Sequence, residues 1–285
     1  MDPVAAIPDI PIASLDDPRL ASYRDVKTKR AEAREGKFIA EGHRVVERLL
    51  ASRYPVESIL ATDRRRHLLD RVDLRGAPVL LLPEDLASEL VGYQFHGGIM
   101  ACGTRLPGPA IGDLFPPATD AAADSVPVEL VVVCPRITDP DNLGGLMRLC
   151  RAFGAAALVV GPPSVDPFSR RVLRVSMGNA FHLPIVQPTD LGGTLSDLKA
   201  AGFELAATLL DPAAVPLATM ARPRRLALLL GNEADGLEPE WAERCDHKVL
   251  IPMALGTDSL NVTVSAGIFL YHFTQVAVQF PASGS

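Results

Sequence analysis

Apolar runs alternate with helical periodicity through the second half of the chain. Strands are predicted at 128–133, 157–160, 203–210, 225–230 and 248–251, and helices at 142–153, 170–179 and from 260 onward. Strands that are apolar on both faces need helices on both sides, and parallel strands need helical crossovers between them. The pattern therefore predicts an α/β fold with a parallel sheet.

The first half carries weaker versions of the same signals. Residues 38–42 predict a strand or turn, the apolar spacing of residues 45–50 predicts an amphipathic helix, and further strands are expected at 58–61, 78–82 and 99–102. From 106 to 127 the composition shifts to Pro, Ala, Gly and Asp, which suits a linker. The predicted organisation is an N-terminal tail at 1–18, a small α/β domain at 19–106, a linker at 107–127 and the parallel-sheet domain at 128–285.

Composition narrows the class of protein. The 285 residues allow one or two domains, and the four cysteines form no C-x-x-C pair while the six histidines are scattered, so neither a disulfide framework nor a metal site is expected. The N-terminus lacks the pattern of a signal peptide. Polar residues interrupt the last helix well short of a membrane span, which favours a buried or dimer-forming helix. We expect a cytoplasmic protein with no membrane or metal partner.

Charge is distributed unevenly along the chain. The net charge is -6, yet residues 19–75 hold 15 Lys/Arg and 9 Asp/Glu, a local balance of +6. Such a stretch could attract nucleic-acid phosphates, although charge alone favours the simpler interpretation of a solvated helix face. The charge pattern therefore needs a second signal before it indicates RNA.

Polar residues follow three of the predicted strands, where open parallel sheets bind their ligands. In the first segment, Asp141 or Asn142 can cap a helix whose apolar stripe leaves Arg148 on another face. In the second, Gly231 lets a ligand approach the backbone and is followed by the carboxylate of Glu233. Alone, each segment also fits an ordinary capped helix or tight turn.

The third segment runs from Ile251 through a short loop to Ser259, Leu260 and Asn261 at the start of the last helix. It aims a hydroxyl and an amide across the strand ends, although Ser259 could equally be a plain N-cap. No Walker lysine loop and no G-x-G-x-x-G fingerprint occurs, so neither phosphate motif supports an NTPase or a dehydrogenase.

In combination and in this order, the three segments resemble the signature motifs of the SpoU family of RNA ribose 2'-O-methyltransferases, in the SPOUT (trefoil-knot) superfamily. Residues 176–184 are similar to the family's segment between the first two motifs. Residues 38–47 resemble the start of the family's ribosomal-protein-like RNA-binding domain. The resemblance extends over the whole chain apart from the tail and the linker.

The resemblance implies a knotted C-terminal domain that binds S-adenosylmethionine, a substrate that is RNA, ribosomal more than transfer RNA, and a homodimer. The cofactor would be held by backbone groups at Gly231, Ile251 and Leu260. The positions that match catalytic or RNA-contacting residues are Asn142, Arg148, Glu233, Ser259 and Asn261.

Guanidinium normally stays charged, so we interpret Arg148 as a group that grips a phosphate and stabilises the developing alkoxide. Asn142 would orient Arg148 or the ribose, Ser259 and Asn261 would bind the nucleotide or hold the loop, and Glu233 would order the site. Two alternatives stay open. One is a non-catalytic RNA-binding protein with an inactive knot domain, and the other is a small-molecule enzyme of Rossmann type.

Overall fold

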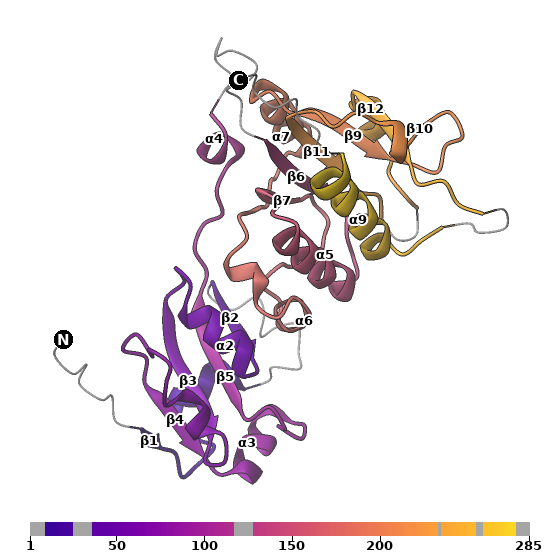
Figure 1. Cartoon of the computed structure of the whole chain (residues 1–285). Helices are drawn as coiled ribbons and strands as arrows, with labels where there is room; N and C mark the ends of the chain where they lie inside the picture. The colour runs from indigo at the N-terminus through magenta and orange to yellow at the C-terminus, as the bar shows by residue number, and fades with distance from the viewer. Residues whose placement is uncertain (1–8, 25–35, 117–127, 233–234, 255–258, 278–285) are drawn as a thin grey trace, which may run out of the picture. The chain divides into compact units, whose positions relative to one another are not determined.

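The computed structural model describes residues 9–24, 36–116, 128–232, 235–254 and 259–277 of the chain. It divides into two compact units (Figure 1). The first consists of Met1–Pro107 together with Asp166–His182, and the second of Gly108–Val165 and Leu183–Ser285. The segment Asp166–His182, which the sequence placed in the parallel-sheet domain, thus packs within the first unit.

The first unit is built on a five-stranded mixed sheet in the order β1-β4-β3-β5-β2. β5 pairs antiparallel with both β2 and β3, whereas β4 pairs parallel with β3 and β1. Its elements are β1 (Ile10–Pro11), η1 (Pro18–Tyr23), β2 (Lys37–Glu41), α2 (His43–Leu50), β3 (Val56–Thr62), η2 (Arg66–Leu69), β4 (Val79–Leu82), α3 (Glu84–Val91), β5 (Ile99–Thr104), α6 (Arg170–Val175) and η4 (Asn179–Phe181).

An aromatic cluster fixes Asp166–His182 to the sheet of this unit. Phe168 and Phe181 of the segment pack with Phe38 of β2 and with Tyr54, at ring-centroid distances of 5.4 to 5.8 Å. All four rings are buried. Met177 (φ 55°) and Gly178 (φ 76°) adopt left-handed backbone just after α6, which turns the chain so that Phe181 returns to the cluster.

The predicted N-terminal tail, 1–18, is partly wrong. Ile10 and Pro11 form β1 against β4, and Ile12 is buried in the same core. Asp9 accepts a hydrogen bond from Arg66 Nε at 2.7 Å. The physical reason is that Ile10 and Ile12, two residues apart in an extended chain, face the same core, a signal that the surrounding prolines hid. Residues 25–35, which contain Lys27, Lys29, Arg30 and Arg34 of the predicted basic stretch, lie outside the described residues.

The second unit contains a seven-stranded sheet in the order β10-β12-β9-β11-β6-β7-β8, in which every pair is parallel. The predicted parallel sheet is confirmed. Its elements are α4 (Ile111–Leu114), β6 (Glu129–Cys134), α5 (Pro140–Ala152), β7 (Ala157–Val160), β8 (Ile185–Val186), α7 (Leu191–Ala200), β9 (Glu204–Thr208), β10 (Val215–Pro216), η5 (Leu217–Thr219), β11 (Arg225–Leu229), α8 (Pro239–Glu243), β12 (His247–Leu250), α9 (Val262–Tyr271) and η6, a short π-helix (His272–Val276).

Helices cover both faces of this sheet. α7, α4 and Trp241 of α8 pack on the face formed by residues such as Val131, Val133 and Leu229. α5 and α9, which contact one another, lie on the opposite face (Figure 1). No helix of the described residues is long and apolar enough to cross a membrane.

The predicted linker, 107–127, is not unstructured throughout. Residues 111–114 form α4, and Ile111 and Phe115 are buried in the core of the second unit. The prolines of this stretch hid these two apolar anchors. Residues 117–127 lie outside the described part of the chain.

Candidate functional site

A cavity of about 600 Å³ opens where β9, β11 and β12 end in the second unit. This is the edge at which parallel α/β sheets bind their ligands. The lining mixes polar and apolar side chains about equally, and Asp235 is the one charged residue among the described lining residues. The lining is made by Thr208, Leu209, Leu210, Gly231, Asn232, Asp235, Gly236, Leu237, Ile251, Met253, Ser259, Leu260, Asn261, Val262, Ser265 and Phe269.

Five of the eight predicted site residues line this cavity: Gly231, Ile251, Ser259, Leu260 and Asn261. They arrive from two separate segments, one after β11 and the other between β12 and α9. Glu233 lies outside the described residues. The structure therefore brings the second and third motif segments together at one site.

The turn after β11 requires glycine at its first position. Asn232 N donates to Gly236 O at 2.7 Å and Gly236 N donates to Asn232 O at 3.0 Å, which closes the turn on itself. A Cβ at Gly231 would lie only 2.4 Å from the backbone of Gly236 and Leu237. The glycine is needed for the turn as well as for access by a ligand.

Asn142 joins the first motif segment to the third. Asn261 Nδ2 donates to Asn142 Oδ1 at 2.9 Å, and Thr263 Oγ1 donates to the same oxygen at 3.3 Å. Asn142 is only 9% exposed, and the bonds fix the orientation of its side-chain amide. Thr263 was missed as a participant from sequence, although it lies two residues beyond Asn261 on α9.

The sequence predicted Asp141 or Asn142 as the N-cap of α5, but the N-cap is Asp139. Its Oδ1 accepts from Asp141 N at 2.6 Å and from Asn142 N at 3.4 Å. Pro140 occupies the first helical position, where proline is favoured, so the cap falls one residue before it. Asn142 is thereby free of capping and can turn its side chain toward Asn261.

α5 and α9 approach closely beside this network. A Cβ on Gly145 would lie 2.7 Å from Thr263 Cγ2, so a larger residue there would push Thr263 away from Asn142. The absence of a side chain at Gly145 thus lets the two helices approach and keeps Thr263 beside Asn142.

Arg148 stands apart from the other predicted residues. It is exposed on α5 and does not line the cavity. Among the described residues, no hydrogen bond or ion pair engages its guanidinium. The structure brings Asn142 to the site but leaves Arg148 outside it.

Arg136 is a feature that the sequence did not reveal. It follows β6 and forms ion pairs with Asp235 and with Glu238, the latter at 3.2 Å between Nε and Oε1. The hydrogen bond that Arg136 donates to the Asp235 carboxylate raises the pKa of Arg136 above its usual range. The strand-end argument, applied to the residues directly after β6, could have found it.

No group of three or more His, Cys, Asp or Glu among the described residues could hold a metal ion. The lining of the cavity suits an organic molecule with both apolar and polar groups.

Comparisons with known proteins give the family. Residues 129–271 match the SpoU rRNA Methylase family, and residues 17–101 match the MRM3-like substrate binding domain. The chain belongs to the SpoU rRNA methylase family. The predicted family, fold class and RNA methyltransferase activity are confirmed.

Full-length relatives are found in several bacteria. The chain is 35% identical to a tRNA/rRNA methyltransferase of Mycobacterium tuberculosis, covering 91% of this chain and 90% of the relative. It is 28% identical to the 23S rRNA (guanosine(2553)-2'-O)-methyltransferase RlmP of Bacillus subtilis, covering 92% and 98%. The AdoMet-bound rRNA methyltransferase from Sinorhizobium meliloti has 26% identity and a TM-score of 0.77, covering 93% and 97%.

Proposed function

We propose that this enzyme transfers a methyl group from S-adenosylmethionine to a ribose 2'-hydroxyl of ribosomal RNA. One observation carries the proposal: the second and third motif segments line one strand-end cavity, and the first is joined to them by the hydrogen bond between Asn142 and Asn261. The MRM3-like substrate binding domain and the 23S rRNA relatives support rRNA as the substrate. An rRNA substrate also supports a cytoplasmic location.

The cavity fits this cofactor. Leu209, Ile251 and Phe269 supply apolar walls for an adenosyl group, and a volume of about 600 Å³ lies within the range of small-molecule sites. Ile251 and Leu260 lie in irregular backbone, where N–H and C=O groups can bind a ligand. We assign them and Gly231 to the cofactor. When bound, the cofactor supplies an electrophilic methyl group on a sulfonium.

The protein's task is to place the ribose in line with that methyl group and to stabilise the oxygen as its proton leaves. We assign the second role to Arg148, whose charge is not neutralised by another described residue. It would grip the phosphate beside the target ribose. The proton would pass to phosphate or water.

Asn142, held by Asn261, would orient the ribose. Ser259 and Asn261 would bind the nucleotide or hold the loop that lines the cavity. For Glu233 we keep the role of ordering the site. Arg136 adds a further anchor, because its ion pairs tie the turn after β11 to the loop after β6.

We further propose that the enzyme is a homodimer with a knotted second unit. Val264, Ile268 and Tyr271 repeat at helical spacing on α9 and remain 39% to 55% exposed. Apolar rows of this kind are normally covered by a partner. In support of the knot, the chain after β12 returns to pack α9 against α5, a helix formed much earlier in the sequence.

The test is tritium transfer from labelled S-adenosylmethionine to 23S rRNA transcribed in vitro, followed by digestion to nucleosides. The expected product is a 2'-O-methylnucleoside. Label on a base would contradict ribose chemistry, and RNA binding without transfer would support the non-catalytic alternative. Sedimentation of the protein tests the homodimer.

A further inference from the structure

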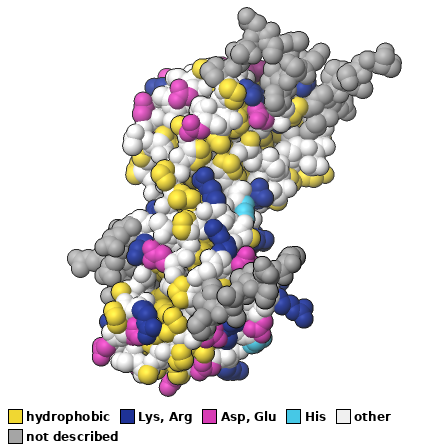
Figure 2. All heavy atoms as spheres, turned by 90° about the vertical axis from the view of Figure 1, so that its left-hand side faces the viewer, with side chains coloured by type: hydrophobic (Ala, Val, Ile, Leu, Met, Phe, Trp, Pro, Cys, Tyr) yellow, Lys and Arg dark blue, Asp and Glu magenta, His cyan; other side chains and the backbone are white. Residues whose placement is uncertain are grey.

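Acidic neighbours neutralise several exposed arginines of the first unit. Arg64 lies 3.1 Å from Glu84, Arg66 contacts both Asp9 and Asp70, and Arg19 pairs with Asp17. Figure 2 shows basic and acidic side chains interspersed over the lower part of the molecule, where this unit lies. The run Arg64-Arg65-Arg66, conspicuous in the sequence, is therefore a weak candidate for binding phosphate.

Arg44 and Arg174 are in a different situation. Both are exposed, and neither has an ion pair or hydrogen bond among the described residues. Arg65 and Arg71 are exposed and unpaired as well, but Asp63 lies two residues before Arg65, and no described residue pairs with its carboxylate. Around Arg44 and Arg174, the carboxylates of Glu41 and Asp166 are each paired with another arginine.

Two ion pairs account for these acids: Glu41 accepts from Arg170 Nη1 at 2.9 Å, and Asp166 pairs with Arg105. A third carboxylate, Glu47, lies 3.5 Å from His43. Asp166–His182 itself contains three arginines and one aspartate, so a surplus of positive charge remains on this part of the unit.

Two hydrogen bonds also link the ends of α2 to the ends of α6. Arg170, at the start of α6, reaches Glu41 just before α2, and Arg48, in the second turn of α2, donates to Met177 O at 2.7 Å just after α6. The two helices therefore run in the same sense. Arg44 lies between Glu41 and Arg48, and Arg174 lies between Arg170 and Met177, so each exposed arginine lies between the two linking contacts along its own segment.

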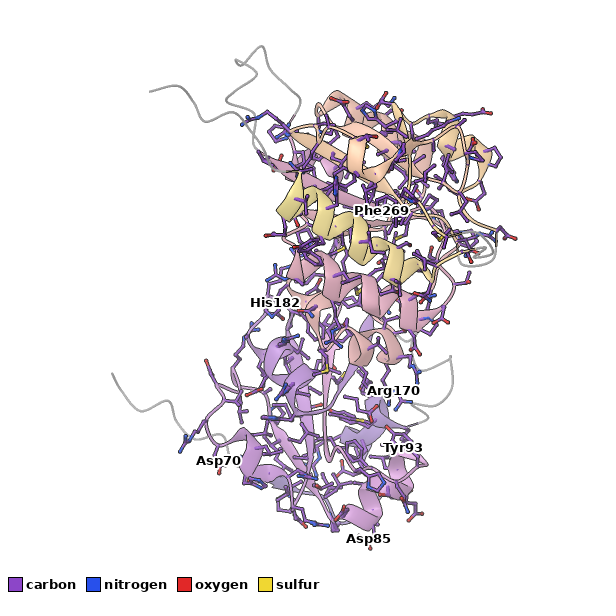
Figure 3. The ribbon with its side chains drawn as sticks, turned by 45° about the vertical axis from the view of Figure 1, so that its right-hand side comes forward. Asp70, Asp85, Tyr93, Arg170, His182 and Phe269 are labelled. Carbon is purple, nitrogen blue, oxygen red and sulfur yellow. The ribbon has the colours of Figure 1, made fainter. Side chains whose placement is uncertain are left out.

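The pair of helices is firmly anchored. Arg170 also donates to Tyr93 Oη at 2.5 Å, and burial raises the pKa of Tyr93 to about 12, so the phenol stays neutral (Figure 3). At the other end His182 Nε2 lies 3.1 Å from Arg48 O. A charged surface on such a support is preorganised, which lowers the entropic cost of binding.

We propose that α2 and α6 together form an RNA-phosphate surface, with Arg44 and Arg174 as its main contacts and the exposed Arg171 beside them. The surface deepens the proposed function, on which it rests, because it specifies where the RNA backbone is held. RNA is the occupant that the charge favours, since guanidinium groups bind phosphate oxygens in a bidentate manner. The first domain supplies only half of the surface, and a segment from between β7 and β8 supplies the other half.

The experiment measures binding of in vitro transcribed 23S rRNA against salt concentration for the full-length protein. Two lost phosphate contacts should flatten the slope of log K against log salt by roughly 1.4 to 1.8 in Arg44→Gln/Arg174→Gln, at about 0.7 to 0.9 per contact. The matched control is Arg65→Gln/Arg71→Gln, which removes two exposed, unpaired arginines of the same unit and should leave the slope nearly unchanged. Arg44→Lys/Arg174→Lys should restore the slope, because the charge is kept.

An unchanged slope in the Arg44/Arg174 double variant, or an equal loss in the control, would overturn the surface. Methyl transfer by the wild-type enzyme is measured in parallel on the same RNA. Transfer with an unchanged slope leaves the proposed function standing and removes the surface alone. A flattened slope without transfer by the wild type keeps the surface and removes the function.

Discussion

The two units display their chemistry in different ways. The second gathers neutral side chains and irregular backbone at the ends of parallel strands, around a cavity with one charged lining residue among those described. The first presents exposed charged side chains on helices over a mixed sheet. An enclosed site suits a small cofactor, whereas an open charged surface suits a long polyanion. Polar residues at strand ends and clustered charge are therefore separate signals in the sequence, and each indicates a different kind of ligand.

The largest effect is expected on the stability of the first unit when its aromatic cluster is lost. Phe38→Ala should lower the free energy of unfolding by about 3–5 kcal/mol, because the buried ring packs on Phe168 and Phe181. Urea titrations followed by circular dichroism should show the shift. The single tryptophan, Trp241, lies in the second unit and reports that unit alone.

If the units unfold independently, the tryptophan transition of Phe38→Ala should stay at its wild-type midpoint. Phe38→Leu is the control, since a large apolar side chain is kept and less than about 1.5 kcal/mol should be lost. Equal shifts of both probes would mean that the units form one cooperative body.

Arg148 offers the sharpest test of the second unit. Arg148→Ala should reduce the rate of methyl transfer by roughly 10²–10³-fold, as loss of a group that stabilises a developing oxyanion does. Cofactor affinity by calorimetry should stay the same, because the cavity is lined by other residues. Arg151→Ala on the same helix is the matched control, also exposed and unpaired among described residues. Cofactor binding lost in step with the rate would show that Arg148 is misassigned.

A smaller effect is expected at the contact between the motif segments. Asn261→Ser removes the amide that donates to Asn142 but keeps an N-cap oxygen for α9. The single-turnover rate should fall by about ten-fold, the cost of one buried hydrogen bond. Stability should change little. An unaltered rate would exclude the bond from positioning Asn142.

The smallest effect concerns the reactivity of the cysteine thiols, which should be low in both units. Burial raises the pKa of the Cys102 thiol to about 11 and of the Cys150 and Cys245 thiols to about 12. At pH 8 about one Cys102 thiol in a thousand is ionised, so alkylation by iodoacetamide should be slow in the native protein and fast after denaturation. Rapid labelling of any one of the three in native conditions, located by mass spectrometry, would show local opening of its unit.

The sequence predicted the parallel sheet well because its strands are apolar on both faces and only the ends shift by one or two residues, as with 128–133 against β6 at Glu129–Cys134. The predicted helix at 170–179 ends at Val175 because left-handed backbone at Met177 and Gly178 stops it. Which unit that helix joins depends on contacts with Phe38, distant in sequence, and no local pattern encodes it.

The location of the candidate site was also predictable from the sequence. Gly231, Ile251, Ser259, Leu260 and Asn261 were chosen by motif order and do line one cavity. Their roles stay predictions. Arg136 and Thr263 were missed because their partners become neighbours only when separate segments meet. Charge counting found the basic first unit but could not tell arginines with acidic partners from those without.

The excursion of Asp166–His182 into the first unit bears on how the chain emerges from the ribosome. Residues up to Pro107 are synthesised first, but the rings that cover Phe38 and Tyr54 follow about 75 residues later. At about 5–20 residues per second this is a delay of roughly 4 to 15 s, during which the nascent first domain exposes an aromatic patch. The order of synthesis thus leaves an interval in which a chaperone can bind, and the interval closes only after the first part of the second unit, 108–165, has been made.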